Sequence, residues 1–432
     1  MSKRGIRLAW TLVLLVACGG DDADKSSVGS SKDVISAGGE ESLVRAERIT
    51  ARARELWQKA IAEFQQYDSE GWSNTKCDRV SAAFEKAAGE QKEGFPEALF
   101  MAGLAQERCG ETDEAVGYYE KSLRANAKYC KARVALGVVA MNRGEASQAM
   151  AMFKQSIKDD ARCTEGYVNL ATLDRTSART KEQYEEVLAN LRRGLAIDAN
   201  YLPAFNQMGL LYLTLAQNDP KLLDLAEVVC RQAQQINKNY APIYNTWGLI
   251  NLRQDRIIEA AAKFRQAFEL DNRLYPAHMN FGQITLSFRG YDDARKAFEQ
   301  ATKLQPRSYE AHIGLGVAWR GLKSPDKAEA EYKKALEIDG NRPEAPFNLG
   351  VLYQDYKGGS PQDYEKAKDY FQEFLSRANN ARFSRAVEDV RRRCQDESAS
   401  KRRRRPTKAC RPGRLQNIEI ALQGLREAGQ GR

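Results

Sequence analysis

The residues best suited to chemistry in this 432-residue chain are eight cysteines and two histidines. Thiols can form disulfides, accept lipids or bind metals, and imidazoles can act as general bases or metal ligands. No Cys-x-x-Cys pair and no histidine cluster is present, so a metal site is not expected. The sequence also lacks a Gly-rich phosphate loop, a nucleophile elbow and a paired-carboxylate motif. It therefore predicts neither an enzyme nor a cofactor site, and favours disulfide and lipid chemistry.

The first cysteine, Cys18, follows a segment with the pattern of a secretory signal peptide. Three cations precede an apolar run at 8–17, and about ten residues are too few to span a bilayer as a helix. Residues 15–18, Leu-Val-Ala-Cys, resemble the bacterial lipobox, which implies a lipid on Cys18 as the first mature residue. An ordinary cleaved signal with an incidental cysteine is the alternative. By analogy with enteric bacteria, Gly19 at the next position favours the outer membrane, facing the periplasm.

A ladder of small residues organises the rest of the chain. Its members lie 34 residues apart or slightly more, at Gly103, Gly137, Ala171, Gly209, Gly248, Gly282, Gly316 and Gly350. In the clearest copy the ladder glycine is followed at fixed offsets by Ala294, Phe298, Ala301 and Pro306. Gly282 lets a first helix approach a second closely, Phe298 fills the space between them, and Pro306 ends the second helix.

These offsets resemble those of the tetratricopeptide (TPR) repeat. The resemblance implies an all-α fold: a right-handed superhelix, or α-solenoid, of about eight to nine helix-turn-helix repeats with a C-terminal helical cap. Three copies carry four or five extra residues between their helices, in the repeats of Ala171, Gly209 and Gly350. A degenerate copy precedes the ladder, with Trp57 and Phe64 on its first helix and Phe84 and Ala87 on its second. Almost no β-structure is expected.

The chain divides into five segments by composition and register. They are a signal peptide at 1–17, a lipidated cysteine with a flexible tether at 18–41, a divergent repeat at 42–95, the repeat array at 96–379, and a capping helix, polybasic loop and terminal amphipathic helix at 380–432. The tether is rich in Gly, Ser, Asp and Glu and has too few apolar residues to fold.

The register assigns both histidines and most cysteines to structural positions. His278 and His312 each lie four residues before a ladder glycine, so we interpret them as equivalent helix positions and not as a catalytic pair. An exported protein meets an oxidising compartment, so disulfides are expected. Cys77 and Cys109 should lie at the same edge of the stack, Cys130 and Cys163 at the starts of successive first helices, and Cys394 and Cys410 on either side of the basic run. These placements predict the disulfides Cys77–Cys109, Cys130–Cys163 and Cys394–Cys410. Cys230 takes the place of Phe298 in its repeat and is expected to be a buried thiol. Alternatively, all seven cysteines after Cys18 are reduced core residues.

The resemblance also implies a protein-binding groove lined mainly by the first helices. Transferred by register, the groove positions are Arg175, Asn206, Leu210, Leu213, Asn245, Leu249, Leu252, Met279, Gln283, Leu286 and Arg320. The set is mostly apolar with scattered amides, and it lacks the clustered Lys, Arg and Asn of a carboxylate clamp. We therefore expect an amphipathic helix or an extended peptide as ligand. The alternative is that the leucines pack against the neighbouring repeat.

The basic excess of the chain lies at its end. From Asn380 onward, fifteen Lys/Arg residues outnumber six Asp/Glu, and the excess of nine equals the net charge of +9 of the whole chain. The basic patch comprises Lys401, Arg402, Arg403, Arg404, Arg405 and Lys408. Nucleic acid is not an expected partner, because the chain carries an export signal and no aromatic residues interleave the cations. An anionic envelope partner and a solvated tail without a specific ligand both remain open.

Together these features favour a membrane-anchored periplasmic scaffold that binds other envelope proteins through its groove. A pilotin-like assembly factor for an outer-membrane component, and a recruiter of a cell-wall enzyme, are the alternatives. The combination of lipobox, tether, repeat number and basic tail is similar to the TPR lipoproteins of gliding deltaproteobacteria, in particular the lipoprotein subunits of myxobacterial adventurous-gliding machinery. That resemblance implies a trans-envelope motility complex.

Overall fold

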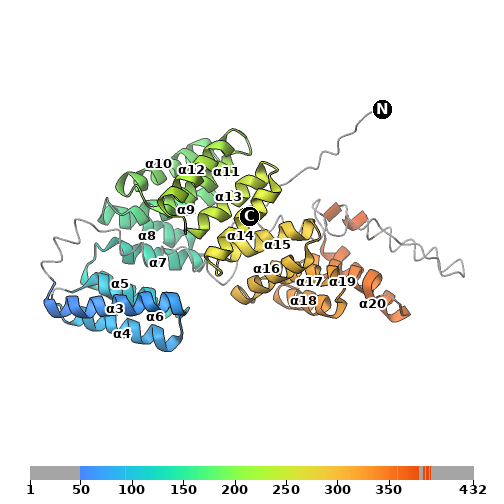
Figure 1. Cartoon of the computed structure of the whole chain (residues 1–432), viewed down its shortest axis with the longest axis horizontal. Helices are drawn as coiled ribbons and strands as arrows, with labels where there is room; N and C mark the ends of the chain where they lie inside the picture. Colours follow the sequence, from blue (N-terminus) through green and yellow to red (C-terminus); the bar gives the residue numbers. More distant parts are fainter. Residues whose placement is uncertain are drawn as a thin grey trace, which may run out of the picture. The chain divides into compact units, whose positions relative to one another are not determined.

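The computed structural model describes residues 49–92, 94–357, 359–378, 383–384, 386–388 and 390. Within these ranges the chain is nearly all helical and contains no strand. The helices form nine successive antiparallel pairs (Figure 1). They divide into two units, one ending at Ile243 and one beginning at Tyr244. No described helix is long and apolar enough to cross a membrane.

Each pair consists of a first and a second helix joined by a short turn. The pairs are α3 (Ala51–Glu70) with α4 (Asn74–Gly89), α5 (Pro96–Glu107) with α6 (Thr112–Ala125), α7 (Cys130–Asn142) with α8 (Ala146–Asp159), α9 (Thr164–Ser177) with α10 (Lys181–Ile197), α11 (Leu202–Leu215) with α12 (Leu222–Ile236), α13 (Ala241–Arg253) with α14 (Ile257–Leu270), α15 (Tyr275–Ser287) with α16 (Tyr291–Leu304), α17 (Tyr309–Gly321) with α18 (Pro325–Ile338), and α19 (Glu344–Leu352) with α20 (Pro361–Arg377).

The glycine ladder sets the packing of six of the nine described pairs, as the sequence predicts. A Cβ atom added to Gly282 on α15 would lie 2.8 Å from the ring of Phe298 on α16. That ring is fully buried, and burial of one such side chain contributes about 1.5–3 kcal/mol. The same glycine–aromatic contact recurs at Gly103–Tyr119, Gly137–Phe153, Gly248–Phe264, Gly316–Tyr332 and Gly350–Phe371.

In five of the described pairs, the turn ends the first helix through a left-handed residue. Seven positions after the ladder glycine, Gly110 and Gly144 have φ values of 82° and 78°. The same slot holds Asp255, Arg289 and Lys323 with φ of 57°, 61° and 58°. A left-handed residue at this position closes the C-terminus of a helix, and glycine occupies it without steric cost.

The loops between pairs are closed by short polar side chains that the sequence analysis missed. Asp160, Asp271 and Asp339 each lie 23 residues after a ladder glycine. Each accepts a hydrogen bond from the backbone N–H two residues later, at 2.8, 2.9 and 3.0 Å. Such Asx turns compete with helix continuation, so they end the second helices that have no proline.

The three longer copies accommodate their extra residues differently. The copy of Ala171 lengthens α10 to 17 residues, and the copy of Gly209 lengthens the turn before α12. In the copy of Gly350, α19 continues into a π-helical segment at Tyr353–Lys357. There Tyr353 donates a hydrogen bond of 2.7 Å to Glu329 of α18, which ties the insertion to the preceding pair.

The apolar face of the last pair is covered by residues beyond α20. Phe383, Ala386 and Val390 are buried and belong to one cluster with Phe347 and Phe374. These three lie near the start of the segment 380–432, where the sequence predicts a capping helix. Such a cap is what a repeat stack needs at its end, because the last pair has no following neighbour.

Candidate protein-binding face

The structure places all eleven predicted groove positions on the first helices of pairs, from α9 to α17. Five of them are partly exposed: Asn206, Leu210, Asn245, Leu252 and Gln283. Asn206 and Leu210 lie on α11, in the unit that ends at Ile243. Asn245 and Leu252 on α13, and Gln283 on α15, lie in the unit that begins at Tyr244. Part of each of these side chains is open to a partner, although the Nε2 atom of Gln283 itself is buried.

The other six groove positions are buried, and for them the expectation of an open surface is wrong. They are Arg175, Leu213, Leu249, Met279, Leu286 and Arg320, with at most 8% exposed. Met279 and Leu286, for example, are fully buried in one cluster with Tyr309 and Ile313 of the following first helix. For Met279 and Leu286 the reason is the alternative that the sequence left open, since these two side chains pack against the next repeat.

The buried polar groove positions form hydrogen bonds between consecutive first helices. Arg175 donates to Gln207 at 3.1 Å, and Arg320 donates to Asn348 at 3.0 Å. A partly exposed position takes part as well, because Asn280 donates to Asn245 at 2.9 Å. We call these three contacts the polar seam. A buried guanidinium or amide without a partner would be strongly destabilising, so the seam holds adjacent repeats together.

The partners in the polar seam were not identified from the sequence. Gln207, Asn280 and Asn348 each lie two residues before a ladder glycine. The signal was therefore present as a recurrent amide at one register position. It could not be interpreted without knowing which side of the first helix meets the next repeat.

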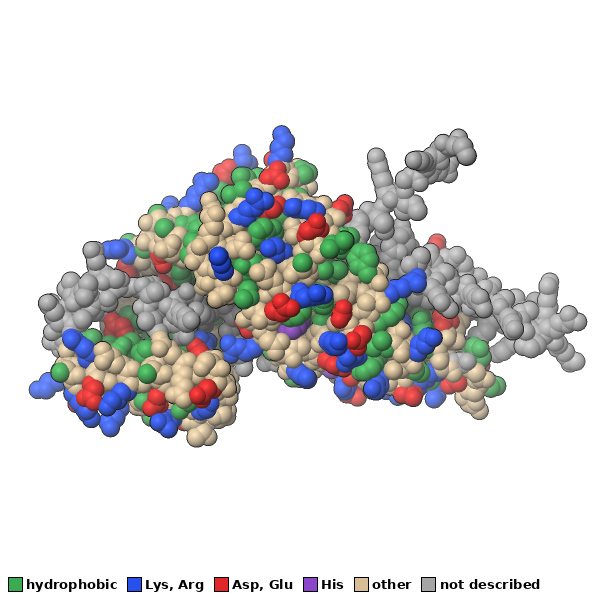
Figure 2. All heavy atoms as spheres, in the orientation of Figure 1, with side chains coloured by type: hydrophobic (Ala, Val, Ile, Leu, Met, Phe, Trp, Pro, Cys, Tyr) green, Lys and Arg blue, Asp and Glu red, His purple; other side chains and the backbone are tan. Residues whose placement is uncertain are grey.

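The face shown in Figure 2 carries no large field of one charge. Lys and Arg side chains are interspersed with Asp and Glu side chains and with hydrophobic groups. An extended anionic ligand would need a continuous cationic surface.

The two histidines occupy equivalent structural positions. The Nε2 atom of His278 lies 3.0 Å from the carbonyl oxygen of Asn272, and that of His312 lies 3.0 Å from the carbonyl of Pro306. In both cases the carbonyl belongs to the residue six positions earlier. Each ring thus fastens the loop that precedes its own helix, in agreement with the register interpretation.

The two histidines have different neighbours, so they do not act together in one site. His278 stacks on Phe268 with ring centroids 4.7 Å apart, and burial lowers its pKa, although the Asn272 carbonyl opposes the shift. His312 Nδ1 lies 2.6 Å from Glu331. Burial opposes ionisation of Glu331, but hydrogen bonds from His312 and Lys334 prevail and lower its pKa.

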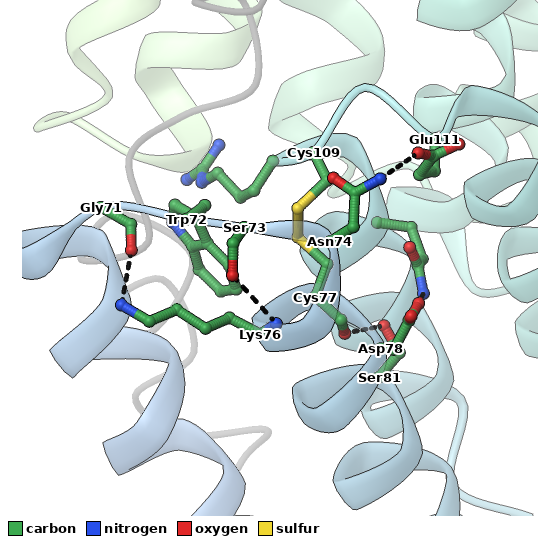
Figure 3. The surroundings of a disulfide bond; sticks show 12 residues. Gly71, Trp72, Ser73, Asn74, Lys76, Cys77, Asp78, Ser81, Cys109 and Glu111 are labelled. Carbon is green, nitrogen blue, oxygen red and sulfur yellow. Dashed lines mark hydrogen bonds between the residues drawn. A yellow bond between two sulfur atoms is a disulfide. The ribbon is translucent and has the colours of Figure 1, made fainter.

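Four cysteines lie in the predicted pairs. The sulfur atoms of Cys77 and Cys109 are at bonding distance with Cα atoms 6.4 Å apart, and those of Cys130 and Cys163 with Cα atoms 6.1 Å apart. Figure 3 shows the first pair, which connects the start of α4 to the turn after α5. Both Cα separations fall in the range that a disulfide requires. Cys230 is fully buried, as expected from its position.

One group of potential metal ligands occurs in the described part of the chain. It consists of Cys130, Cys163 and Glu165. Glu165 forms an ion pair of 3.4 Å with Lys131. Once the two sulfurs are joined, a single carboxylate remains, and it already has a cationic partner.

Several predicted sites lie outside the described residues. They are the lipidation site Cys18, the pair Cys394–Cys410, and the basic patch formed by Lys401, Arg402, Arg403, Arg404, Arg405 and Lys408. These assignments stay predictions from the sequence.

Comparison with known proteins agrees with the helical pairs. Models of the tetratricopeptide repeat match residues 96–129 and 279–346. No match was found among curated proteins. The APC/C hetero-tetramer Cut9–Hcn1 is similar in fold, with a TM-score of 0.53, 14% identity, and coverage of 74% of this chain and 58% of that chain.

Two bacterial structures are also similar over shorter parts of this chain. A thermophilic TPR protein of Thermus thermophilus has a TM-score of 0.40 and 20% identity, covering 44% of this chain and 99% of its own. Pseudomonas aeruginosa pilF has a TM-score of 0.39 and 15% identity, covering 56% of this chain and 96% of its own.

Proposed function

We propose that this chain, whose helical pairs match models of the tetratricopeptide repeat at 96–129 and 279–346, is a non-enzymatic scaffold, because such repeats generally mediate protein–protein interactions. The observation that supports this most directly is the set of partly exposed amides and leucines on its first helices, at Asn206, Leu210, Asn245, Leu252 and Gln283. Amides can bind the backbone of an extended peptide, and leucines can bind its apolar side chains.

We further propose that the scaffold works in the bacterial cell envelope. The lipobox-like residues 15–18 support a lipid on Cys18, and the paired cysteines support an oxidising compartment. The protein would then be an outer-membrane lipoprotein that faces the periplasm and binds other envelope proteins. The similarity of lipobox, tether, repeat number and basic tail to the lipoproteins of gliding bacteria makes a motility complex the first complex to test.

The binding face is tested by paired variants in cells. A photo-crosslinking residue at Gln283 should capture specific envelope proteins, and Leu252→Glu should reduce their yield at least about tenfold, since a buried charge opposes apolar contact. Ile258→Glu is the control, because Ile258 is 84% exposed in the first turn of α14, a second helix. Circular dichroism should be unchanged for both variants. Equal losses in both variants, or in neither, would contradict binding at this face.

The identity of the captured proteins separates the candidate roles. A stable set of several envelope proteins supports the scaffold, whereas one outer-membrane protein captured only during its assembly supports a pilotin-like factor. A cell-wall hydrolase or synthase supports the recruiter.

The membrane anchor is tested separately. In Cys18→Ser the protein should leave the membrane fraction, because a signal without its lipidated cysteine provides no acyl chain. Mass spectrometry of the N-terminal peptide should show the acyl groups in the parent only. Membrane association that persists in the variant and weakens with salt would instead implicate the basic residues at 401–408.

A further inference from the structure

The pair Cys130–Cys163 occupies a position that recurs along the stack. Cys130 is the first residue of α7, and Cys163 directly precedes α9, the next first helix. The two cysteines are 33 residues apart in sequence. A contact between these positions connects the N-termini of consecutive first helices. We call such a contact a joint.

Two other joints have different chemistry at the same spacing. Tyr275, the first residue of α15, lies with its hydroxyl 2.6 Å from the hydroxyl of Ser308, which precedes α17; these residues are also 33 apart. The guanidinium of Arg342 lies over the ring of Tyr309, the first residue of α17, at 3.9 Å from the ring centroid. The spacing from 309 to 342 is again 33 residues. One slot therefore accepts a sulfur pair, a hydrogen bond or a cation–π contact.

The sulfur joint differs from the other two in what remains after it is broken. Hydroxyl and guanidinium groups make contacts that reform spontaneously. Two thiols are weak hydrogen-bond donors and acceptors, so a reduced pair makes no comparable contact, and the ion pair of Lys131 with Glu165 at 3.4 Å is left to connect the starts of α7 and α9. The pair Cys77–Cys109 does not substitute for it, because it connects α4 with the end of α5 and not two first helices.

We propose that Cys130–Cys163 is a reducible joint, and that a dithiol acting on it loosens the step from α7 to α9 while the other steps keep their packing. One thiolate of the reductant attacks Cys130, which is 8% exposed against 1% for Cys163, and displaces the Cys163 sulfur. The second thiolate then releases Cys130. Two electrons and two protons pass to the cysteines, and the reductant becomes a disulfide.

The proposal predicts a local response to reduction. The test uses the purified chain with Cys77→Ser and Cys109→Ser, oxidised with glutathione disulfide, so that Cys130–Cys163 is the only described sulfur pair left. Dithiothreitol should accelerate amide hydrogen exchange at the starts of α7 and α9 by at least about fivefold. Exchange at the starts of α15 and α17 should not change. Thiol counting confirms reduction in the same samples.

Substituting the residue pair of one joint by that of the other tests whether the two positions are structurally equivalent. Cys130→Tyr with Cys163→Ser installs the groups of the Tyr275–Ser308 joint, and it should exchange as slowly as the oxidised parent with no response to dithiothreitol. Conversely, Tyr275→Cys with Ser308→Cys should become oxidised under the same mild conditions.

Three results would overturn the proposal. They are failure of Cys130–Cys163 to oxidise, unchanged exchange after verified reduction, and exchange in Cys130→Tyr/Cys163→Ser as fast as in the reduced parent. All measurements use purified protein, so they do not depend on the proposed location or partners. Failure of the envelope function would leave them unaffected.

Discussion

At the residue scale, the ladder glycines allow close packing because they have no side chain to collide with the aromatic ring of the second helix. The sequence predicted this packing well, since a glycine and an aromatic residue at a fixed offset define both surfaces of the contact. Phe298 lies between Gly282 of its own pair and Gly314 of the next. The second of these contacts was not predicted, because Gly314 lies outside the ladder.

A matched pair of substitutions tests the close approach at Gly282. Gly282→Ala places a methyl group 2.8 Å from the Phe298 ring, and overpacking of this kind costs about 1–3 kcal/mol. Gly117→Ala on α6 meets open space, so it should raise the free energy of unfolding by about 0.5–1 kcal/mol through helix propensity. Urea denaturation measures both. A stabilised Gly282→Ala would contradict the close packing.

Glu329 gives the chain a pH-dependent contact at acidic pH. Burial opposes its ionisation, but hydrogen bonds from Lys333, Lys357 and Tyr353 outweigh burial and lower its pKa from 4.5 to about 2. A carboxylate with a lowered pKa stabilises the fold above its unfolded pKa, and this stabilisation is lost as the pH falls from about 4.5 to 2.

The variant Glu329→Gln isolates this contribution. It should unfold more easily than the parent at pH 7, because Lys333 loses its carboxylate partner and Lys357 keeps only Asp326. Below pH 5 the parent should lose stability more steeply than the variant. Denaturation midpoints at pH 7, 4 and 2.5 provide the comparison, and parallel curves would exclude Glu329 as the titrating group.

At the element scale, helix boundaries follow from short signals within each repeat. Pro306 was recognised as the end of α16, whereas the Asx turns at Asp160, Asp271 and Asp339 were not. The polar seam was missed for a related reason. A single helix sequence shows that Asn348 recurs in register, but only the packing of α17 against α19 shows that Arg320 is its partner.

The left-handed slot in the turns provides a reciprocal test at this scale. Lys323 adopts φ of 58° and Gly144 adopts 78° at equivalent positions. Lys323→Gly should raise the free energy of unfolding by about 0.5–1 kcal/mol, because relief of backbone strain exceeds the added flexibility of the unfolded chain. Gly144→Ala should lower it by about 1 kcal/mol. Thermal denaturation of both variants should show shifts of opposite sign, and shifts of the same sign would be inconsistent with this turn geometry.

At the scale of the whole molecule, repeat number and fold class could be predicted, and the binding surface only in part. A periodic sequence specifies which residues are equivalent, and that is sufficient for an array of pairs. It does not specify how much of the surface of each pair is buried by the next pair. For this reason Leu252 and Gln283 stay partly exposed while Leu286, assigned to the same surface, is fully buried. Partner binding should therefore depend on fewer residues than the register alone suggests.

The polar seam also restricts how this array could evolve by recombination. The period from Gly248 to Gly350 is uniform at 34 residues, so loss of one repeat would leave the backbone pattern intact. Loss of the repeat at 275–308 would, however, bring Asn245 opposite Gly314 in place of Asn280, and Gly314 has no amide side chain to donate. Uniform spacing makes these repeats look like interchangeable modules, but their side-chain hydrogen bonds fix the order in which they can follow one another.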